Sequence, residues 1–141
     1  MSTIQIGDIY RVNLDENDAI TPKGGLDFRP KYCVVIGTPD YGYYVAYLVV
    51  DHEINLRFNP TRDKIDGFFP ITRKDYPQII KPHYDPSWID TNSVREMEES
   101  RMLAAGPRCC CLNQSDLELV LGLLRESKEF SPKQKKRWGL I

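Results

Sequence analysis

Two short, continuous apolar runs separated by a turn constrain the fold more than any other feature of the chain. Residues 32–36 and residues 43–50 are rich in β-branched and aromatic side chains and show no polar alternation. Such runs are too short for ordinary helices and are typical of strands buried on both faces. Residues 38–42 between them carry proline, aspartate and glycine, which is a turn signal. The sequence therefore predicts a buried hairpin in the middle of a small, strongly bent sheet.

An arginine stands just before the first of these strands. Arg29 precedes Pro30, which lacks an N–H group and fixes its own φ, so Pro30 suits a strand start and favours an extended Arg29. We expect a fixed cation where a rigid sheet meets a loop. The alternative is an arginine that only extends from a strand end into solvent. The long polar connection at residues 15–27 ends beside Arg29 and is either a functional loop or a plain surface loop.

The composition is that of one domain built from short strands. The chain has 141 residues with ten prolines and nine glycines, and 41% of its residues are hydrophobic, so we expect a single core. A net charge of −1 gives no global attraction to nucleic acid or membrane, so any basic surface must be local. No apolar run approaches the ~18 residues that span a bilayer, and the N-terminus lacks a secretory pattern. We therefore expect a cytoplasmic protein.

The four cysteines are expected to be reduced and buried. They stand at positions 33, 109, 110 and 111, and a contiguous run cannot supply the spaced pairs of a disulfide framework or a metal site. Residues 103–112 are interpreted as a strand in which Cys109 and Cys111 face one way and Cys110 the other, each acting as a small hydrophobe. A catalytic thiol is the less favoured alternative.

Alternation and helix capping predict the remaining elements. Strands are expected at residues 7–14, 67–71 and, with a break, 87–97, while the proline-rich residues 72–87 wrap the surface. Ser115-Asp116-Leu117-Glu118 has the pattern of a capping box, and an apolar stripe follows it, so a closing helix is expected at residues 116–127. We expect one domain over residues 1–127 and a solvated basic tail at residues 128–141.

Four stretches match, in order, the motifs of a known family. They are Gly7-Asp8-Ile9-Tyr10-Arg11-Val12-Asn13-Leu14, the loop Lys23-Gly24-Gly25, Arg29-Pro30 followed by Val34-Val35-Ile36, and the strand over residues 87–97. In this order they resemble the MazF/PemK (Kid) family of toxin endoribonucleases. The resemblance implies a mainly β fold, an SH3-like (MazF/PemK/CcdB-type) small barrel with a C-terminal α-helix packed on it, and a homodimer.

The resemblance also implies an activity and its partners. It implies the toxin of a type II toxin-antitoxin system, an endoribonuclease that cleaves single-stranded RNA without a metal or cofactor and leaves a 2′,3′-cyclic phosphate. Attack by the 2′-hydroxyl needs a base, an acid and positive charge on the phosphorane. Arg29 matches the family's catalytic arginine, whose guanidinium presents a planar fork to phosphate oxygens. An acidic antitoxin peptide is the expected protein partner, covering Arg29.

The chain departs from the family pattern after the second buried strand. The threonine or serine that the family carries there falls at Val49 or Val50, neither of which donates a hydrogen bond. Asp51 or His52 can replace it as catalytic residues, and an imidazole has the pKa for acid–base work near neutral pH. The alternative for His52 is a loop residue in contact with solvent.

The resemblance implies three further residues that bind the RNA. By their spacing to the strand at residues 87–97, Asn92 and Arg95 match a family aspartate and arginine that help catalysis or RNA contact, and Lys23 lies in the matching loop.

A second class of function stays open because the family's hydroxyl is missing. It is a non-catalytic SH3-like module that binds a peptide or nucleic acid through the tyrosines at residues 41–44 and the basic tail.

Overall fold

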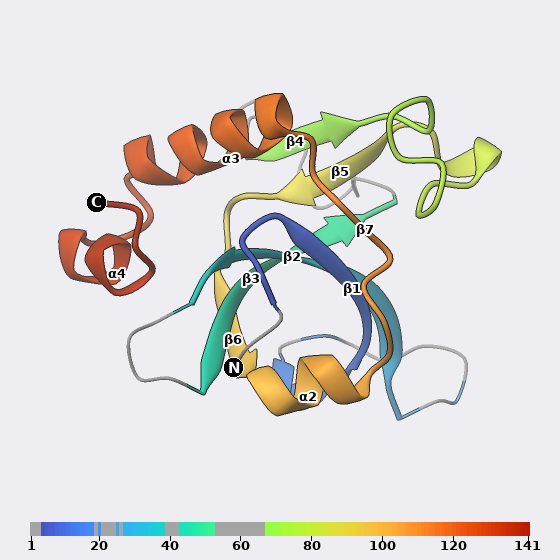
Figure 1. Cartoon of the computed structure of the whole chain (residues 1–141), viewed down its shortest axis with the longest axis horizontal. Helices are drawn as coiled ribbons and strands as arrows, with labels where there is room; N and C mark the ends of the chain where they lie inside the picture. The colour runs from blue at the N-terminus through green and yellow to red at the C-terminus, as the bar shows by residue number, and fades with distance from the viewer. Residues whose placement is uncertain (1–3, 19, 21–24, 26, 39–42, 53–66) are drawn as a thin grey trace.

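The chain is built on one curled antiparallel sheet (Figure 1). The computed structural model describes residues 4–18, 20, 25, 27–38, 43–52 and 67–141. Within them the strands are β1 (Asp8–Leu14), β2 (Arg29–Gly37), β3 (Tyr44–Asp51), β4 (Phe68–Ile71), β5 (Ser87–Asp90), β6 (Arg95–Glu98) and β7 (Cys110–Cys111). Their order is β4-β5-β3-β2-β1-β7, with β6 also paired to β3. The mainly β fold and the central β2–β3 hairpin are as the sequence predicts.

The strand β3 organises the curl because it has two partners on one of its edges. Its first half pairs with β6, where Tyr47 lies opposite Arg95, and its end pairs with β5, where Val50 lies opposite Ile89. The expected break in the extended segment at residues 87–97 is the stretch that carries the chain from β5 to β6. The two halves of this edge thereby lead into different parts of the sheet, as Figure 1 shows.

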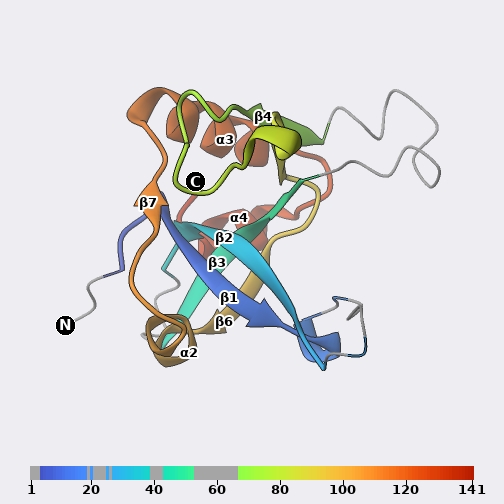
Figure 2. The same cartoon turned by 90° about the vertical axis from the view of Figure 1, so that its right-hand side faces the viewer.

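Apolar side chains pack on both faces of the sheet. Alternation along β1 turns Tyr10, Val12 and Leu14 to one face, where they cluster with Met102 of the short helix α2 (Glu99–Ala104). Ile9 belongs to the opposite cluster, which includes residues of α3 (Gln114–Glu126). Figures 1 and 2 show α2 and α3 on opposite sides of the sheet. Both faces are thus buried over the middle of the sheet, which explains the continuous apolar runs in β2 and β3.

The closing helix α3 forms where the sequence predicts, but its cap is different. The helix covers Gln114–Glu126 rather than residues 116–127. Asn113 is the N-cap, and its side-chain oxygen accepts a hydrogen bond from the Asp116 N–H at 2.8 Å. The capping box assigned to Ser115 is wrong, because a serine and an asparagine are both good caps and Asn113 lies first along the chain. None of the described helices is long and apolar enough to cross a bilayer.

The stretch expected as a solvated tail is folded. Residues 132–137 form the helix α4 (Pro132–Arg137), with a capping box in which Ser131 and Gln134 bond reciprocally. Its lysines face solvent or lie half-buried at the surface, but Phe130, Trp138 and Leu140 are buried in the α3-side core. The tail expectation was therefore wrong. The basic residues of this stretch indicated a solvated tail, but its three apolar side chains, Phe130, Trp138 and Leu140, pack into the core.

A close approach fixes α4 against the sheet. A Cβ placed on Gly37, at the end of β2, would overlap the Trp138 carbonyl oxygen, so this position has room only for glycine. From β6, Glu96 accepts hydrogen bonds from the Arg137 Nε at 2.8 Å and from the Trp138 Nε1 at 3.0 Å. The C-terminal residues thus belong to the folded domain.

The expected strand at residues 103–112 is also corrected. Leu103 belongs to the end of α2, and only Cys110 and Cys111 pair with β1 as β7. All four cysteines are free thiols. Cys33 is buried and Cys109 and Cys110 are half-buried, but Cys111 is exposed, so burial of all four was wrong. Because β7 is so short, no described strand pairs with this edge of β1 beyond Ile9.

Candidate functional site

A groove of about 460 Å³ lies on the sheet and is walled by the proline-rich segment. Its floor comes from three adjacent strands, since Arg11 of β1 is opposite Tyr32 of β2, and Tyr32 is opposite Val50 of β3. Its wall comes from the segment that was expected to wrap the surface. We call it the cationic groove, and it is lined by Arg11, Arg29, Pro30, Lys31, Tyr32, Val50, His52, Ile79, Lys81 and Tyr84.

Four permanent cations line this groove. Arg29 is the first residue of β2 and is half-buried, and its guanidinium makes no hydrogen bond or ion pair with any residue that the structure describes. Lys31 is held differently, because its Nζ donates to the Asp51 Oδ1 at 2.9 Å and its side chain is 9% exposed. Arg11 and Lys81 are exposed. Since one carboxylate offsets only one of these charges, the groove attracts anions.

His52 lines the same groove directly after β3, and a hydrogen bond fixes its tautomer. Its Nδ1 lies 2.9 Å from the Ser87 Oγ, which in turn lies 2.8 Å from the Tyr84 carbonyl oxygen. A carbonyl only accepts, so the single hydroxyl hydrogen of Ser87 is donated to Tyr84, and Ser87 must accept from Nδ1–H. In the neutral ring, Nε2 therefore carries the lone pair. This is the nitrogen available to act as a base.

Aromatic neighbours hold the plane of the imidazole. The Tyr84 ring stacks on His52 at a centroid distance of 4.5 Å and an interplanar angle of 14°. The Tyr32 ring approaches from the side, at 6.2 Å and 76°. With Nδ1 tied to Ser87 and one face covered by Tyr84, the imidazole keeps a single orientation.

The surroundings favour the neutral form of His52. Burial lowers the pKa of His52 below its ordinary value, and the nearby charge of Lys31 lowers it further. The carboxylate of Asp51 opposes these effects, while Arg29 and His83 add to them. A histidine that is neutral at neutral pH and has a fixed tautomer is suited to take a proton from a substrate hydroxyl.

The structure brings together two of the three expected catalytic residues. Arg29 and His52 line one groove, since Arg29 begins β2 and His52 directly follows β3 in the predicted hairpin. Asp51 is the last residue of β3, and its carboxylate is engaged by Lys31 rather than lining the groove. Its effect on the groove is electrostatic, through Lys31 and His52.

The expected RNA contacts do not line this groove in the described part of the chain. Asn92 is exposed, and its side chain donates to the Gly67 carbonyl oxygen at 3.3 Å. Arg95 begins β6 opposite Tyr47, and its Nη1 is buried without a hydrogen-bond partner among the described residues. Lys23 lies outside the described residues. Arg95 therefore belongs to another part of the sheet, and Asn92 lies between β5 and β6.

Several residues of the site were missed by the sequence reasoning. Arg11 had a usable signal, because alternation with Tyr10 and Val12 places it on the opposite face of β1. Lys81, Tyr84 and Ser87 had none, since their positions depend on how the proline-rich segment returns to the end of β3. Long-range pairing of this kind is not visible in local sequence.

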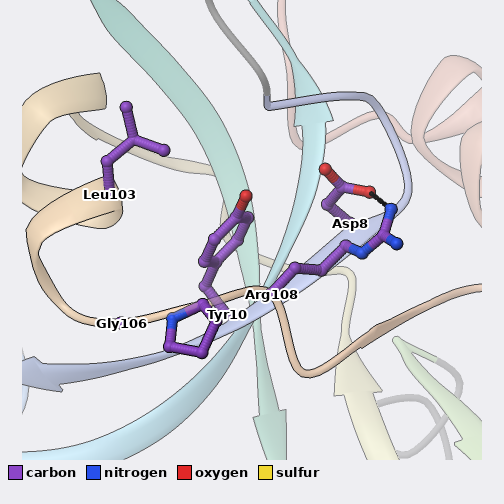
Figure 3. Close-up of a pocket in the computed structure, with 6 residues that line it drawn as sticks. Asp8, Tyr10, Leu103, Gly106 and Arg108 are labelled. Carbon is purple, nitrogen blue, oxygen red and sulfur yellow. Dashed lines mark hydrogen bonds and ion pairs between the residues drawn. The ribbon is translucent and has the colours of Figure 1, made fainter.

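Two further depressions continue from the cationic groove around the edge of β1. The first, of about 300 Å³, is lined by Arg11, Asn13 and residues 105–109, and we call it the bridging depression. The second, of about 470 Å³, is the Arg108 depression, lined by Asp8, Tyr10, Leu103, Gly106, Pro107 and Arg108. Figure 3 shows the Arg108 guanidinium turned toward the Asp8 carboxylate, with Nη1 and Oδ1 3.4 Å apart.

No model of a protein family matches the chain, and no curated protein sequence does. Within the described residues, no three His, Cys, Asp or Glu side chains are arranged to hold a metal ion. The structure itself shows a mainly β chain with a cationic groove and an oriented histidine.

Proposed function

We propose that this chain is an endoribonuclease that cleaves single-stranded RNA without a metal, by attack of the ribose 2′-hydroxyl on the adjacent phosphorus. The observation that carries the proposal is that one groove holds both an arginine with no partner among the described residues and an oriented histidine whose neutral form is favoured. Each supplies one of the functions that this reaction needs. The resemblance to the MazF/PemK toxins points to the same chemistry.

His52 takes the role of general base. Its Nε2 accepts the proton of the 2′-hydroxyl while Nδ1–H stays bonded to Ser87. The attacking oxygen then bonds to phosphorus, and the bond from phosphorus to the 5′-oxygen breaks, which leaves a 2′,3′-cyclic phosphate. The departing 5′-oxygen takes up one proton, so the reaction has no net proton demand and the imidazolium can return the proton it received.

Arg29 takes the role of the fixed charge on the phosphate. Its guanidinium is free of described partners, so phosphate oxygens need not displace an existing ion pair. In the reaction, negative charge builds on the non-bridging oxygens, and a fixed cation stabilises the transition state more than the ground state. Lys31 adds charge but is held by Asp51, so Asp51 acts in this proposal by positioning Lys31 rather than by moving a proton.

The missing family hydroxyl is accounted for in this proposal. Val50 lies on the groove floor and is buried, so it provides only apolar surface. A serine hydroxyl does reach the site from β5, but Ser87 is buried and both its bonds go to protein groups. The proposal therefore gives base chemistry to His52 and leaves Ser87 to orient it.

We also propose the finer fold and the biological role that the resemblance implies. A curled antiparallel sheet with a helix packed on one face suits an SH3-like barrel of the MazF/PemK kind. A groove with an excess of positive charge suits an acidic antitoxin peptide as the silencing partner, in a type II toxin-antitoxin system. A homodimer is part of the same proposal.

The direct test is cleavage of a long single-stranded RNA by the purified protein in EDTA. Discrete products with 2′,3′-cyclic phosphate ends are expected, and the same strand with 2′-O-methyl groups should stay intact because the nucleophile is blocked. The His52→Gln variant should lose cleavage, whereas Lys128→Gln, at an exposed lysine outside the groove, should retain it. Intact RNA that the protein nevertheless binds would support the non-catalytic module instead.

A further inference from the structure

We propose that the RNA strand leaves the cationic groove over Arg11 and continues to a second phosphate-binding position at Arg108. This inference rests on the proposed function, because it assigns the path of the same substrate beyond the reacting phosphate. It makes the preferred substrate an extended single strand several nucleotides long rather than a dinucleotide or mononucleotide.

The continuity of the surface is the first support. Arg11 lines both the cationic groove and the bridging depression. Gly106, Pro107 and Arg108 line both the bridging depression and the Arg108 depression. The three hollows are therefore joined by shared residues, and together they form one path around the edge of β1.

The charges along this path are the second support. Arg11 is exposed and makes no ion pair with the described residues, so it is free to meet a phosphate. The Arg108 side chain is 54% exposed and its contact with the 4% exposed Asp8 is long, at 3.4 Å. A guanidinium has five N–H donors, so Arg108 can keep Asp8 and still donate to a phosphate oxygen. The spacing of cations along a strip is the pattern that follows a nucleic-acid backbone.

The open edge of β1 is the third support. The Cys109 N–H donates to the Ile9 carbonyl oxygen, so in an antiparallel strand the backbone groups two residues on, at Arg11, also point away from β2. β7 ends before it can pair with them. This places a backbone N–H beside the bridging depression, where it can donate a hydrogen bond to a phosphate oxygen. The next carbonyl on this edge, at Asn13, is occupied by Arg101 at 3.0 Å.

The Arg108 depression also offers apolar surface. Leu103 of α2 is 41% exposed at its rim, and Pro107 lines the same hollow. Figure 3 shows Leu103 and the Tyr10 ring on the side of the hollow away from the ion pair. A base can pack against this surface while its phosphate meets Arg108, with no need for base-specific hydrogen bonds.

The test is binding of non-cleavable RNA of increasing length. Fully 2′-O-methylated oligonucleotides of about 3, 6 and 12 nucleotides are titrated by fluorescence anisotropy into the wild type, Arg108→Gln, Arg11→Gln and the control Lys128→Gln. The path predicts that affinity rises with length and that Arg108→Gln weakens the longest oligonucleotide most, by roughly two- to fivefold for an exposed ionic interaction. It also predicts that the slope of log affinity against log salt concentration becomes shallower by about 0.7 for each phosphate that a variant no longer neutralises.

Two controls accompany these titrations. Thermal melts establish that each variant is folded, and Arg108→Lys, which keeps a cation beside Asp8, should restore most of the affinity.

The outcomes separate this inference from the proposed function. Length-dependent binding with an Arg108 effect supports the path whether or not RNA is cleaved, and cleavage is scored separately with unmodified RNA. Affinity that stops rising at the shortest oligonucleotide overturns the path, as does an Arg108→Gln effect equal to that of Lys128→Gln. Absence of binding at every length overturns both the path and the proposed function.

Discussion

The Nδ1 of His52 lies 2.9 Å from the Oγ of Ser87, and that hydroxyl has only one hydrogen, which it donates to the Tyr84 carbonyl. The two strands that bring these residues together, β3 and β5, are far apart in the sequence. One buried hydroxyl thus decides which nitrogen of the imidazole faces a substrate. The proposed base chemistry depends on this bond.

Replacing Ser87 by alanine removes the acceptor for Nδ1–H and lets the ring adopt either tautomer. We expect cleavage by Ser87→Ala to fall by roughly five- to tenfold in kcat, because an orienting hydrogen bond of this kind is worth about 1 kcal/mol. Nitrogen chemical shifts of the His52 ring should show a mixture of tautomers. Ser87→Thr keeps the hydroxyl and should recover much of the rate, and Ser93→Ala, at an exposed serine, is the matched control. An unchanged rate and a single tautomer in Ser87→Ala would remove the orienting role.

The pH dependence of cleavage should reflect the lowered pKa of His52. Because burial and Lys31 lower the pKa, the base is neutral at all pH values above its ordinary value of 6.5, and kcat/KM should fall only as the pH drops below 6.5. Lys31→Gln removes a cation and frees Asp51 beside the imidazole. Both changes raise the pKa of His52, so the fall in kcat/KM should begin at a higher pH. The remaining charges that act on the ring are Arg29 and His83. The assignment of the base would be contradicted if kcat/KM of the wild type began to fall above pH 6.5. It would also be contradicted if His52→Gln showed the same fall as the wild type.

The C-terminal residues should contribute strongly to stability. Trp138 is 6% exposed, packs at right angles to Phe130, and donates through Nε1 to Glu96. Trp138→Ala should lower the free energy of unfolding by about 3 kcal/mol, as a large core truncation does. Urea denaturation measures this loss, with Lys133→Ala on exposed α4 surface as the control. A Trp138→Ala protein as stable as the wild type would mean that residues 128–141 are the solvated tail after all.

The two possible caps of α3 can be separated by a pair of alanine variants. Asn113→Ala removes the oxygen that accepts the Asp116 N–H and should cost about 1 kcal/mol. Ser115→Ala lies inside the first turn, where alanine is the better helix former, so it should cost nothing measurable. Denaturant midpoints of the two variants decide the matter. The reverse order of stability would restore Ser115 as the cap.

Local patterns were enough for the parts of the fold whose contacts are local. The apolar runs in β2 and β3 with a turn between them define a hairpin, and the same geometry places Arg29 and His52 near each other. The helix α2 is only one and a half turns long, too short to be recognised from local sequence, and the strand expected at residues 103–112 overlapped its last two residues. Folding of residues 128–141 depends on three apolar side chains meeting a core formed elsewhere.

Only part of the site could be predicted from the sequence, because several of its contacts join segments that are far apart in the chain. A fixed arginine follows from Arg29-Pro30, but the partner that orients His52 sits on β5 and the aromatic wall comes from the proline-rich segment. Asp51 was placed correctly at the strand end, but the sequence does not reveal its ion pair with Lys31, and its catalytic role stays a prediction. Long-range pairing, not residue type, decides these roles.

The measurement that bears most directly on the account is the cleavage rate of Arg29→Gln beside its melting temperature. The guanidinium has no partner among the described residues and lines the groove, so its loss should leave the melting temperature within about 2 °C of the wild type. The same variant should lose at least roughly a hundredfold in single-turnover cleavage of single-stranded RNA in EDTA, because the charge on the phosphorane is no longer offset. Cleavage at the wild-type rate by a folded Arg29→Gln protein would contradict the proposed function.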